Sequence, residues 1–225
     1  MLYSGKDLRK LIIPLIIEQI LAIAVGMADT IMVSAAGEAA VSGVSLVDTV
    51  NILLINVFSA LATGGAVVSG HFLGKKKRED ACKSAWQILL FATLLALVIS
   101  VIFIAAHDPL LRLMFGKIED DVMQASKTYL IITTYSFVAL AVYNSCAALF
   151  RAMNESKVTM WVSLLMNAIN VVGNAICIYG LHMGVAGVAI PTTISRYVAA
   201  IVIFLLMFQP KKEINLCGQI TWKFN

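Results

Sequence analysis

The sequence predicts an all-α integral membrane protein built from six transmembrane helices. Of its 225 residues, 60% are hydrophobic and 13% are charged, which is about half the charged share of a soluble domain. Long runs without Asp, Glu, Lys or Arg recur along the chain, and several exceed the roughly 20 residues that cross a bilayer core. These runs do not alternate in polarity as β-barrel strands do. A soluble enzyme, a nucleic-acid-binding protein and a disordered chain are therefore all disfavoured.

The six spans follow from the positions of these apolar runs. The first run is too long for the apolar region of a signal peptide, so we expect it to be retained as a helix. The run 158–195 is too long for one helix, and the turn-forming stretch 179–184 divides it. The expected helices cover residues 11–35, 44–72, 84–106, 126–150, 158–180 and 185–208, forming one lobe over 11–208. Residues 1–10 form a tail, and residues 209–225 form a second tail or the start of a linker.

Lysine and arginine predict the orientation of the bundle. Thirteen of them lie in the two tails and in the loops after the second and fourth helices, whereas three lie on the other side. Because cytoplasmic loops carry the basic excess, both termini are expected in the cytoplasm of a multi-pass protein of the cell inner membrane. The basic run 75–78 is then a topology signal in contact with membrane lipid, and no nucleic acid is expected as a partner.

Function is sought where polar residues lie at membrane depth, because burying them there is costly. Asp29 is the strongest candidate: it lies about 10 Å inside the outer end of the first helix and can bind Na⁺ or take up a proton. The alternative is a capping or snorkelling carboxylate near the interface. Asn167, Asn170 and Asn174 share one face of the fifth helix, which suits a cation shell or a polar ligand, or else hydrogen bonds between helices.

Other helices carry similar polar stripes. The second helix carries Asp48 and Asn51, the fourth carries Thr133 and Asn144, and Arg196 lies in the sixth. Together these stripes predict a water-accessible cavity for a small-molecule substrate, with Thr133, Asn144, Asn167 and Arg196 facing it. Pro191 frees a backbone carbonyl and is expected to bend the sixth helix. Cysteine and histidine spacings match no metal or haem motif, so no cofactor is expected, and no metal beyond Na⁺ at Asp29.

Several short motifs occur along the chain in a specific order and spacing. They are Ile13-Pro14-Leu15, Met27-Ala28-Asp29-Thr30, Ala62-Thr63-Gly64-Gly65, Gly74-Lys75-Lys76, Phe150-Arg151-Ala152-Met153-Asn154, Asn167-x-x-Asn170 and the stretch 184–192. In this order they resemble the N-terminal lobe of multidrug and toxic compound extrusion (MATE) transporters, over essentially all of the chain.

The resemblance implies a secondary antiporter that exports drugs or organic cations in exchange for H⁺ or Na⁺. It implies an N-lobe cation site made of Asp29, Asn170, Asn174 and Thr192, a cavity-lining role for Asn144, and a bend of the first helix at Pro14. The family pattern often has Asp where this chain has Asn174, so Asp29 is left as the one titrating carboxylate. The family also has two lobes. We therefore expect either a fragment of a longer transporter, which we favour, or the association of two copies.

Three other functions are weighed against this one. A lipid-linked precursor flippase of the same superfamily needs a strongly basic cavity, and only Arg196 lies clearly inside a span. A membrane-embedded enzyme is disfavoured because no metal spacing, nucleophile–base pair or phosphate loop is found. A non-transporting membrane assembly partner is the third.

Overall fold

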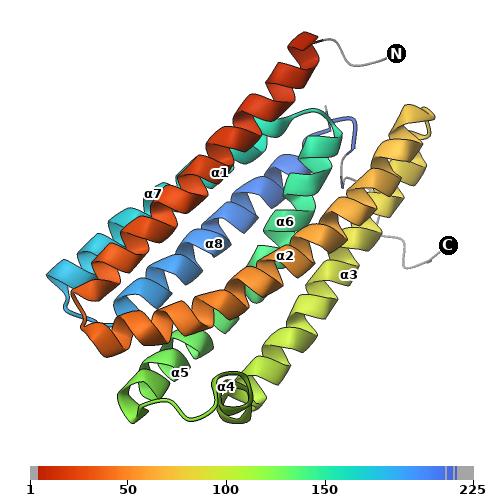
Figure 1. Cartoon of the computed structure of the whole chain (residues 1–225). Coiled ribbons are helices and arrows are strands. Elements are labelled where there is room, and N and C mark those ends of the chain that lie inside the picture. Colours follow the sequence, from red (N-terminus) through yellow and green to blue (C-terminus); the bar gives the residue numbers. More distant parts are fainter. Residues whose placement is uncertain (1–4, 211, 215, 217–225) are drawn as a thin grey trace.

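The computed structural model describes residues 5–210, 212–214 and 216, and these form a bundle of long helices (Figure 1). The helices are α1 (Gly5–Ser34), α2 (Glu38–Gly74), α3 (Arg78–Ala105), α4 (His107–Phe115), α5 (Asp120–Thr134), α6 (Phe137–Ala152), α7 (Ser156–Ala175) and α8 (Ala186–Met207). A π-helical turn, Ile176–Gly180, extends α7. Most of the expected second tail lies outside the described residues.

The helices are long and apolar enough to cross a membrane, as the sequence predicts. Five of the described helices satisfy that test singly, and a sixth span results if α5 and α6 are counted as one broken span. Their outward faces carry large side chains that are more than half exposed, including Ile23, Leu94 and Val101. An apolar outer surface of this kind is typical of a chain surrounded by lipid.

The expected fourth helix, 126–150, is broken. The axes of α5 and α6 differ by 52° across residues 135–136, although no proline lies there. Thr134 Oγ1 donates to the carbonyl of Leu130 at 2.6 Å, and Ser136 Oγ donates to the carbonyl of Thr133 at 2.6 Å. Hydroxyls that bond to backbone carbonyls one turn earlier compete with the helical ladder and bend it. Pro14 and Pro191, in contrast, lie inside continuous helices, so their bending roles stay predictions.

The beginnings of four helices differ from expectation. α1 begins at Gly5, inside the expected tail 1–10, and α2, α3 and α5 begin at Glu38, Arg78 and Asp120 rather than at residues 44, 84 and 126. Glu38 and Glu79 lie in the first turns of α2 and α3, where a carboxylate interacts favourably with the helix dipole. Helix beginnings that contain charged residues are missed by a search for apolar runs without charges.

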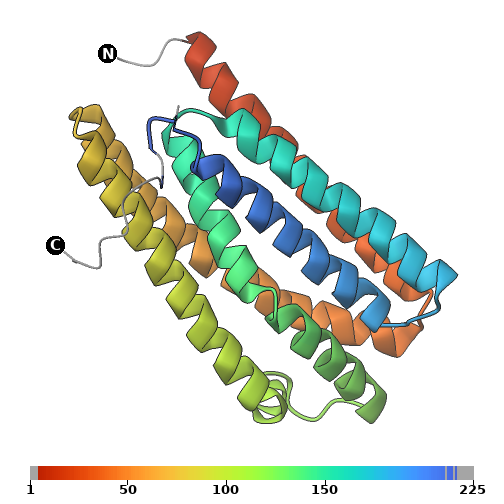
Figure 2. The same ribbon diagram turned by 180° about the vertical axis from the view of Figure 1, so that it is seen from behind.

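The helices form two groups that meet at α6 and α8 (Figures 1 and 2). α1 packs mainly on α7, and α7 packs on α8, while α2 packs on α3, α5 and α6. α1 and α2 leave their connection at residues 35–37 in diverging directions. Close approach elsewhere depends on small residues. A Cβ built on Gly43 of α2, for example, would lie 2.8 Å from the backbone nitrogen of Ser126 of α5.

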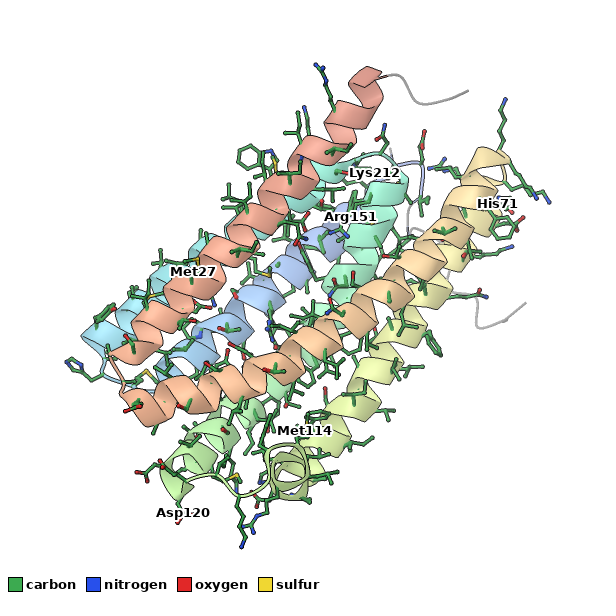
Figure 3. All side chains as sticks on the ribbon, viewed as in Figure 1. Met27, His71, Met114, Asp120, Arg151 and Lys212 are labelled. Carbon is green, nitrogen blue, oxygen red and sulfur yellow. The ribbon has the colours of Figure 1, made fainter. Side chains whose placement is uncertain are left out.

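The two ends of the bundle differ in charge. Figure 3 places His71 and Lys212 at one end and Met114 and Asp120 at the other. The first end also holds the α2–α3 connection with its basic run 75–78. This arrangement agrees with the distribution of charge along the sequence, while the assignment of the basic end to the cytoplasm stays a prediction.

Candidate functional site

A crevice of about 560 Å³ lies between the diverging helices α1 and α2, with α6, α7 and α8 as its floor. The volume is in the range of pockets that hold small organic ligands. Its walls carry three carboxylates, two guanidinium groups and several amide and hydroxyl side chains. They form three groups: one around Asp29, one around Asp48 and one around Glu18.

The first group joins α1, α7 and α8 by a chain of hydrogen bonds. Asn174 Nδ2 donates to Asp29 Oδ1 at 2.7 Å and to Asn170 Oδ1 at 3.3 Å. Asn170 Nδ2 donates to Thr192 Oγ1 at 2.8 Å, and Thr192 Oγ1 donates to the carbonyl of Val188 at 2.8 Å. The four residues that the resemblance groups as an N-lobe cation site therefore lie together. They offer carboxylate, amide and hydroxyl oxygens, the ligand types that hard cations prefer.

The second group lies around Asp48 of α2. Tyr129 Oη of α5 donates to Asp48 Oδ1 at 3.0 Å, and Asn51 Nδ2 donates to the same oxygen at 3.2 Å. Arg196 of α8 donates from Nη1 to Ser136 Oγ at 2.8 Å and lines the same crevice as Asp48 and Asp29. The two aspartates and the arginine thus form one electrostatic unit reached from three helices.

The third group is an ion pair at the inner end of the crevice, which is the end nearer Lys212 and the basic end of the bundle (Figure 3). Arg151 Nη2 of α6 lies 3.1 Å from Glu18 Oε1 of α1. Tyr143 Oη donates to Glu18 Oε1 and Thr159 Oγ1 donates to Glu18 Oε2, both at 3.4 Å. Four hydrogen-bonding or charged side chains therefore tie α1 to α6 and α7 at this depth.

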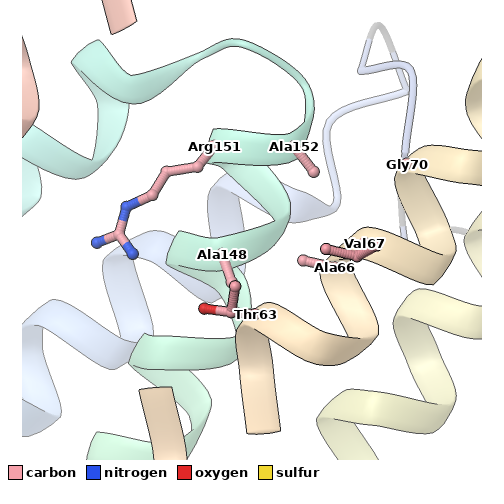
Figure 4. Close-up of a pocket in the computed structure, with 7 residues that line it drawn as sticks. All are labelled: Thr63, Ala66, Val67, Gly70, Ala148, Arg151 and Ala152. Atoms are coloured by element: carbon pink, nitrogen blue, oxygen red, sulfur yellow. The ribbon is translucent and has the colours of Figure 1, made fainter. Parts of the chain in front are cut away.

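Arg151 also separates the crevice from a smaller cavity. That cavity, of about 340 Å³, is lined by small side chains of α2 and α6 together with the stem of Arg151. Figure 4 shows the guanidinium of Arg151 directed away from the other lining residues, such as Thr63 and Ala152. Its charge is therefore turned toward Glu18, and the other described lining residues of the smaller cavity are uncharged.

Three of the four residues expected to face a cavity do line the crevice: Asn144, Asn167 and Arg196. Thr133 does not. It is fully buried beside the break between α5 and α6, and its Oγ1 donates to the carbonyl of Tyr129 at 2.8 Å. The stripe that groups Thr133 with Asn144 assumes one continuous helix, and the 52° bend removes that shared face.

The polar stripe of the second helix includes Asp48, but sequence reasoning assigns Asp48 no partner and does not reveal the Glu18–Arg151 pair. Because α2 begins at Glu38, Asp48 lies about 15 Å along the helix. Glu18 and Arg151 are far apart in sequence, so only the packing of α1 against α6 and α7 reveals their contact.

Comparison with known proteins agrees with this architecture. The sequence model of the MatE family matches residues 14–176. The "Uncharacterized transporter YisQ" of Bacillus subtilis is 32% identical over 199 residues, covering 86% of this chain and 43% of that protein. The "Probable multidrug resistance protein NorM" of Thermotoga maritima is 26% identical over 215 residues, covering 94% of this chain and 46% of that protein. The chain thus spans about half the length of the curated relatives it matches.

Solved structures share the same fold. An outward-facing multidrug resistance MATE family transporter of the MOP superfamily superposes with a TM-score of 0.87 at 23% identity, over 95% of this chain and 47% of that one. A MATE protein in a bent conformation superposes with a TM-score of 0.88 at 21% identity, over 98% of this chain and 50% of that one. At these identities the likeness establishes the fold, while the family-model match over most of the chain establishes the relationship. The chain belongs to the MatE family, the multidrug and toxic compound extrusion transporters.

Proposed function

We propose that this chain forms one lobe of a secondary antiporter that exports drugs or organic cations in exchange for H⁺ or Na⁺. The observation that carries the proposal is the hydrogen-bonded chain from Asp29 to Thr192, which opens on a crevice large enough for an organic ligand. Asp29 is the charged member of that chain and takes up the coupling ion. Two similar proteins, from Thermotoga maritima and Halalkalibacterium halodurans, carry multidrug resistance in their names.

The ion would act on the attachment of α1. With Asp29 charged, Asn174 of α7 donates to it and holds the two helices together. Binding of Na⁺ or a proton changes that contact, so the bound and empty states favour different positions of α1. Since a ligand shifts an equilibrium only by its differential affinity for the two states, this change is what couples the ion to the crevice.

A second lobe completes the substrate cavity in this proposal. The crevice between α1 and α2 is open on the side away from its floor, and the matched relatives are about twice as long as this chain. The opposite wall is then supplied by further helices of a longer protein or by a second copy of this chain. The basic end of the bundle faces the cytoplasm, and the protein lies in the cytoplasmic membrane.

The test is ion-driven efflux of a cationic dye from cells or vesicles that contain the chain together with the further helices or second copy that completes the cavity. Export by the native protein is expected to follow an imposed Na⁺ or pH gradient, and Asp29→Asn is expected to abolish it. Asp108→Asn serves as the matched control, because Asp108 is an exposed carboxylate of α4 outside the crevice. If Asp29→Asn exports like the native protein, Asp29 does not carry the coupling ion. If the native protein shows no gradient-driven efflux, antiport is wrong.

A lipid-linked precursor flippase remains the second candidate, because Arg196 and Arg151 both line the crevice. Arg151 is paired with Glu18, however, which leaves Arg196 as the cationic side chain without a carboxylate at ion-pair distance among the described lining residues. Binding of a lipid pyrophosphate that is lost in Arg196→Ala would favour this candidate over a drug exporter.

A further inference from the structure

The charges in the crevice do not balance. The described residues that line it include three carboxylates and two guanidinium groups. Glu18 and Arg151 neutralise each other at the inner end, where they lie 3.1 Å apart. The outer part therefore holds Asp29 and Asp48 against Arg196 alone, with one negative charge in excess. Such a charge away from bulk water is costly, so this part of the crevice has reason to bind one positive charge.

Asp48 meets charged and titratable groups from each helix around it. Tyr129 of α5 donates to it, and Asp29 of α1 and Arg196 of α8 line the same crevice. α6 contributes Tyr143 and Arg151, both of which are engaged by Glu18, and the described crevice residues of α7 are uncharged. Asp48 thus interacts with the same arginine as Asp29 and belongs to the same electrostatic unit.

Two unsatisfied amide oxygens give independent evidence for a ligand. Asn51 is 2% exposed and uses its Nδ2 to donate to Asp48, while its Oδ1 is buried without a hydrogen-bond partner. Asn174 is fully buried and uses its Nδ2 to donate to Asp29, while its Oδ1 likewise has no partner. Each carboxylate therefore has a neighbouring amide with a vacant acceptor. Buried acceptors are almost always satisfied, and a cation satisfies an amide oxygen as a donor does.

We propose that Asp48 is a second cation-binding carboxylate, and that Asp29 and Asp48 together take up one monovalent cation, Na⁺ or a proton in its place. The proposal rests on the proposed function only in assigning Asp29 to the ion. Asn174 of α7 cannot titrate, and Asp48 supplies the second carboxylate from α2 instead. With Na⁺, the two carboxylates and the vacant oxygens of Asn51 and Asn174 form an all-oxygen ligand set. With a proton, one carboxylate becomes the neutral acid and Arg196 balances the other.

The test is equilibrium binding of radioactive Na⁺ to the purified chain in detergent, at pH 8 and at pH 6, with no substrate and no gradient. The wild type is expected to bind one Na⁺ per chain at pH 8 and to bind it at least tenfold more weakly at pH 6, because protons compete. Asp48→Asn and Asp29→Asn are each expected to weaken binding tenfold or more, whereas Asp108→Asn leaves it unchanged. Asn51→Leu is expected to weaken Na⁺ binding, because it removes an oxygen ligand, and to shift proton release to higher pH, because it also removes a donor to the Asp48 carboxylate.

The proposal is overturned if Asp48→Asn binds Na⁺ like the wild type while Asp29→Asn does not bind. It is also overturned if the wild type binds no Na⁺ and releases no more protons between pH 6 and pH 8 than the Asp29→Asn/Asp48→Asn double variant. Should Asp48→Asn lose helicity by circular dichroism, Tyr129→Phe decides: removing the donor to Asp48 is expected to tighten cation binding, and unchanged binding would refute the role. A chain that binds the ion without exporting dye upholds this proposal and overturns only the exporter.

Discussion

The ion pair between Glu18 and Arg151 offers a quantitative test of how α1 is held. The whole residue Glu18 is 8% exposed, and its carboxylate has Arg151 as its charged partner at 3.1 Å, with two hydroxyls at 3.4 Å. Arg151→Met keeps most of the apolar stem and removes the charge, which leaves the Glu18 carboxylate buried with neutral partners alone. Glu18→Gln together with Arg151→Met removes both charges and keeps a hydrogen-bonding group for Tyr143.

The expected cost follows from the burial of the pair. Breaking a fully buried pair by removing one partner costs about 3–5 kcal/mol, whereas removing both is close to neutral. The side chains of Arg151 and Glu18 are 28% and 11% exposed, so water screens the pair in part. We therefore expect Arg151→Met to lower the free energy of unfolding by about 2–3 kcal/mol and the double variant to lie within about 1 kcal/mol of the wild type.

The measurement is reversible unfolding in mixed micelles with increasing dodecyl sulfate, followed by circular dichroism, for the wild type, both single variants and the double variant. Lys157→Met is the matched control, because Lys157 is an exposed basic residue near the start of α7. A coupling energy below about 0.5 kcal/mol would show that the pair is no stronger than an exposed surface pair and would refute the reasoning.

Three further predictions follow from contacts outside the crevice. Gly43→Ala is expected to lower the free energy of unfolding by about 1–3 kcal/mol, because its new Cβ meets α5 at 2.7–3.0 Å, whereas Gly26→Ala, with nothing within 4 Å, changes it little. Arg78→Ala is expected to speed proteolysis after α8, because its guanidinium bonds three carbonyls of residues 210–213; an unchanged cleavage rate would contradict this. A hydrogen bond from Lys127 holds the pKa of Asp108 below its ordinary value. The stabilisation of the fold by this hydrogen bond is therefore complete above the pKa that Asp108 has in the unfolded chain. It is lost as pH falls through the lower pKa of Asp108 in the folded chain. Lys127→Met should raise the Asp108 pKa in an NMR titration.

The number and order of the spans are predictable from the sequence because a bilayer imposes its requirement on composition. A run such as 84–106 has to be apolar whatever it packs against. The helix beginnings at Glu38 and Arg78 are not predictable in that way, since a charged residue separates each of them from the apolar run that follows. The bend between α5 and α6 depends on hydroxyl bonds at Thr134 and Ser136, for which the sequence offers residue types but no geometry.

The candidate site is likewise predictable only in part. Asn170 and Asn174 lie one helical turn apart, and helix periodicity alone places them on one face. Their contacts with Asp29 and Thr192 depend on the register between helices, which comes from packing. Asp48 belongs to the polar stripe that the sequence places on the second helix, but its contact with Tyr129 of α5 depends on the same packing.

The position of Glu18 and Asp29 on α1 explains why an ion in the crevice would act on this helix. The two residues are eleven positions apart, which is close to three full turns, so they face the crevice from the same side and lie about 16 Å apart along the axis. Apolar packing holds α1 weakly: in its most apolar 18-residue stretch 11% of the residues are buried, against 44% in the corresponding stretch of α8. Its attachment therefore depends on the polar contacts at these two points. An ion that alters the Asp29 contact changes a large share of what holds α1, whereas the same change on α8 would be resisted by the core around it.

Arg151→Met, which loosens the contact at Glu18, should therefore also weaken the response of α1 to an ion bound at Asp29. Distances between spin labels on α1 and α2, measured with and without Na⁺, would test this: an unchanged Na⁺ response in Arg151→Met would show that the two points act independently.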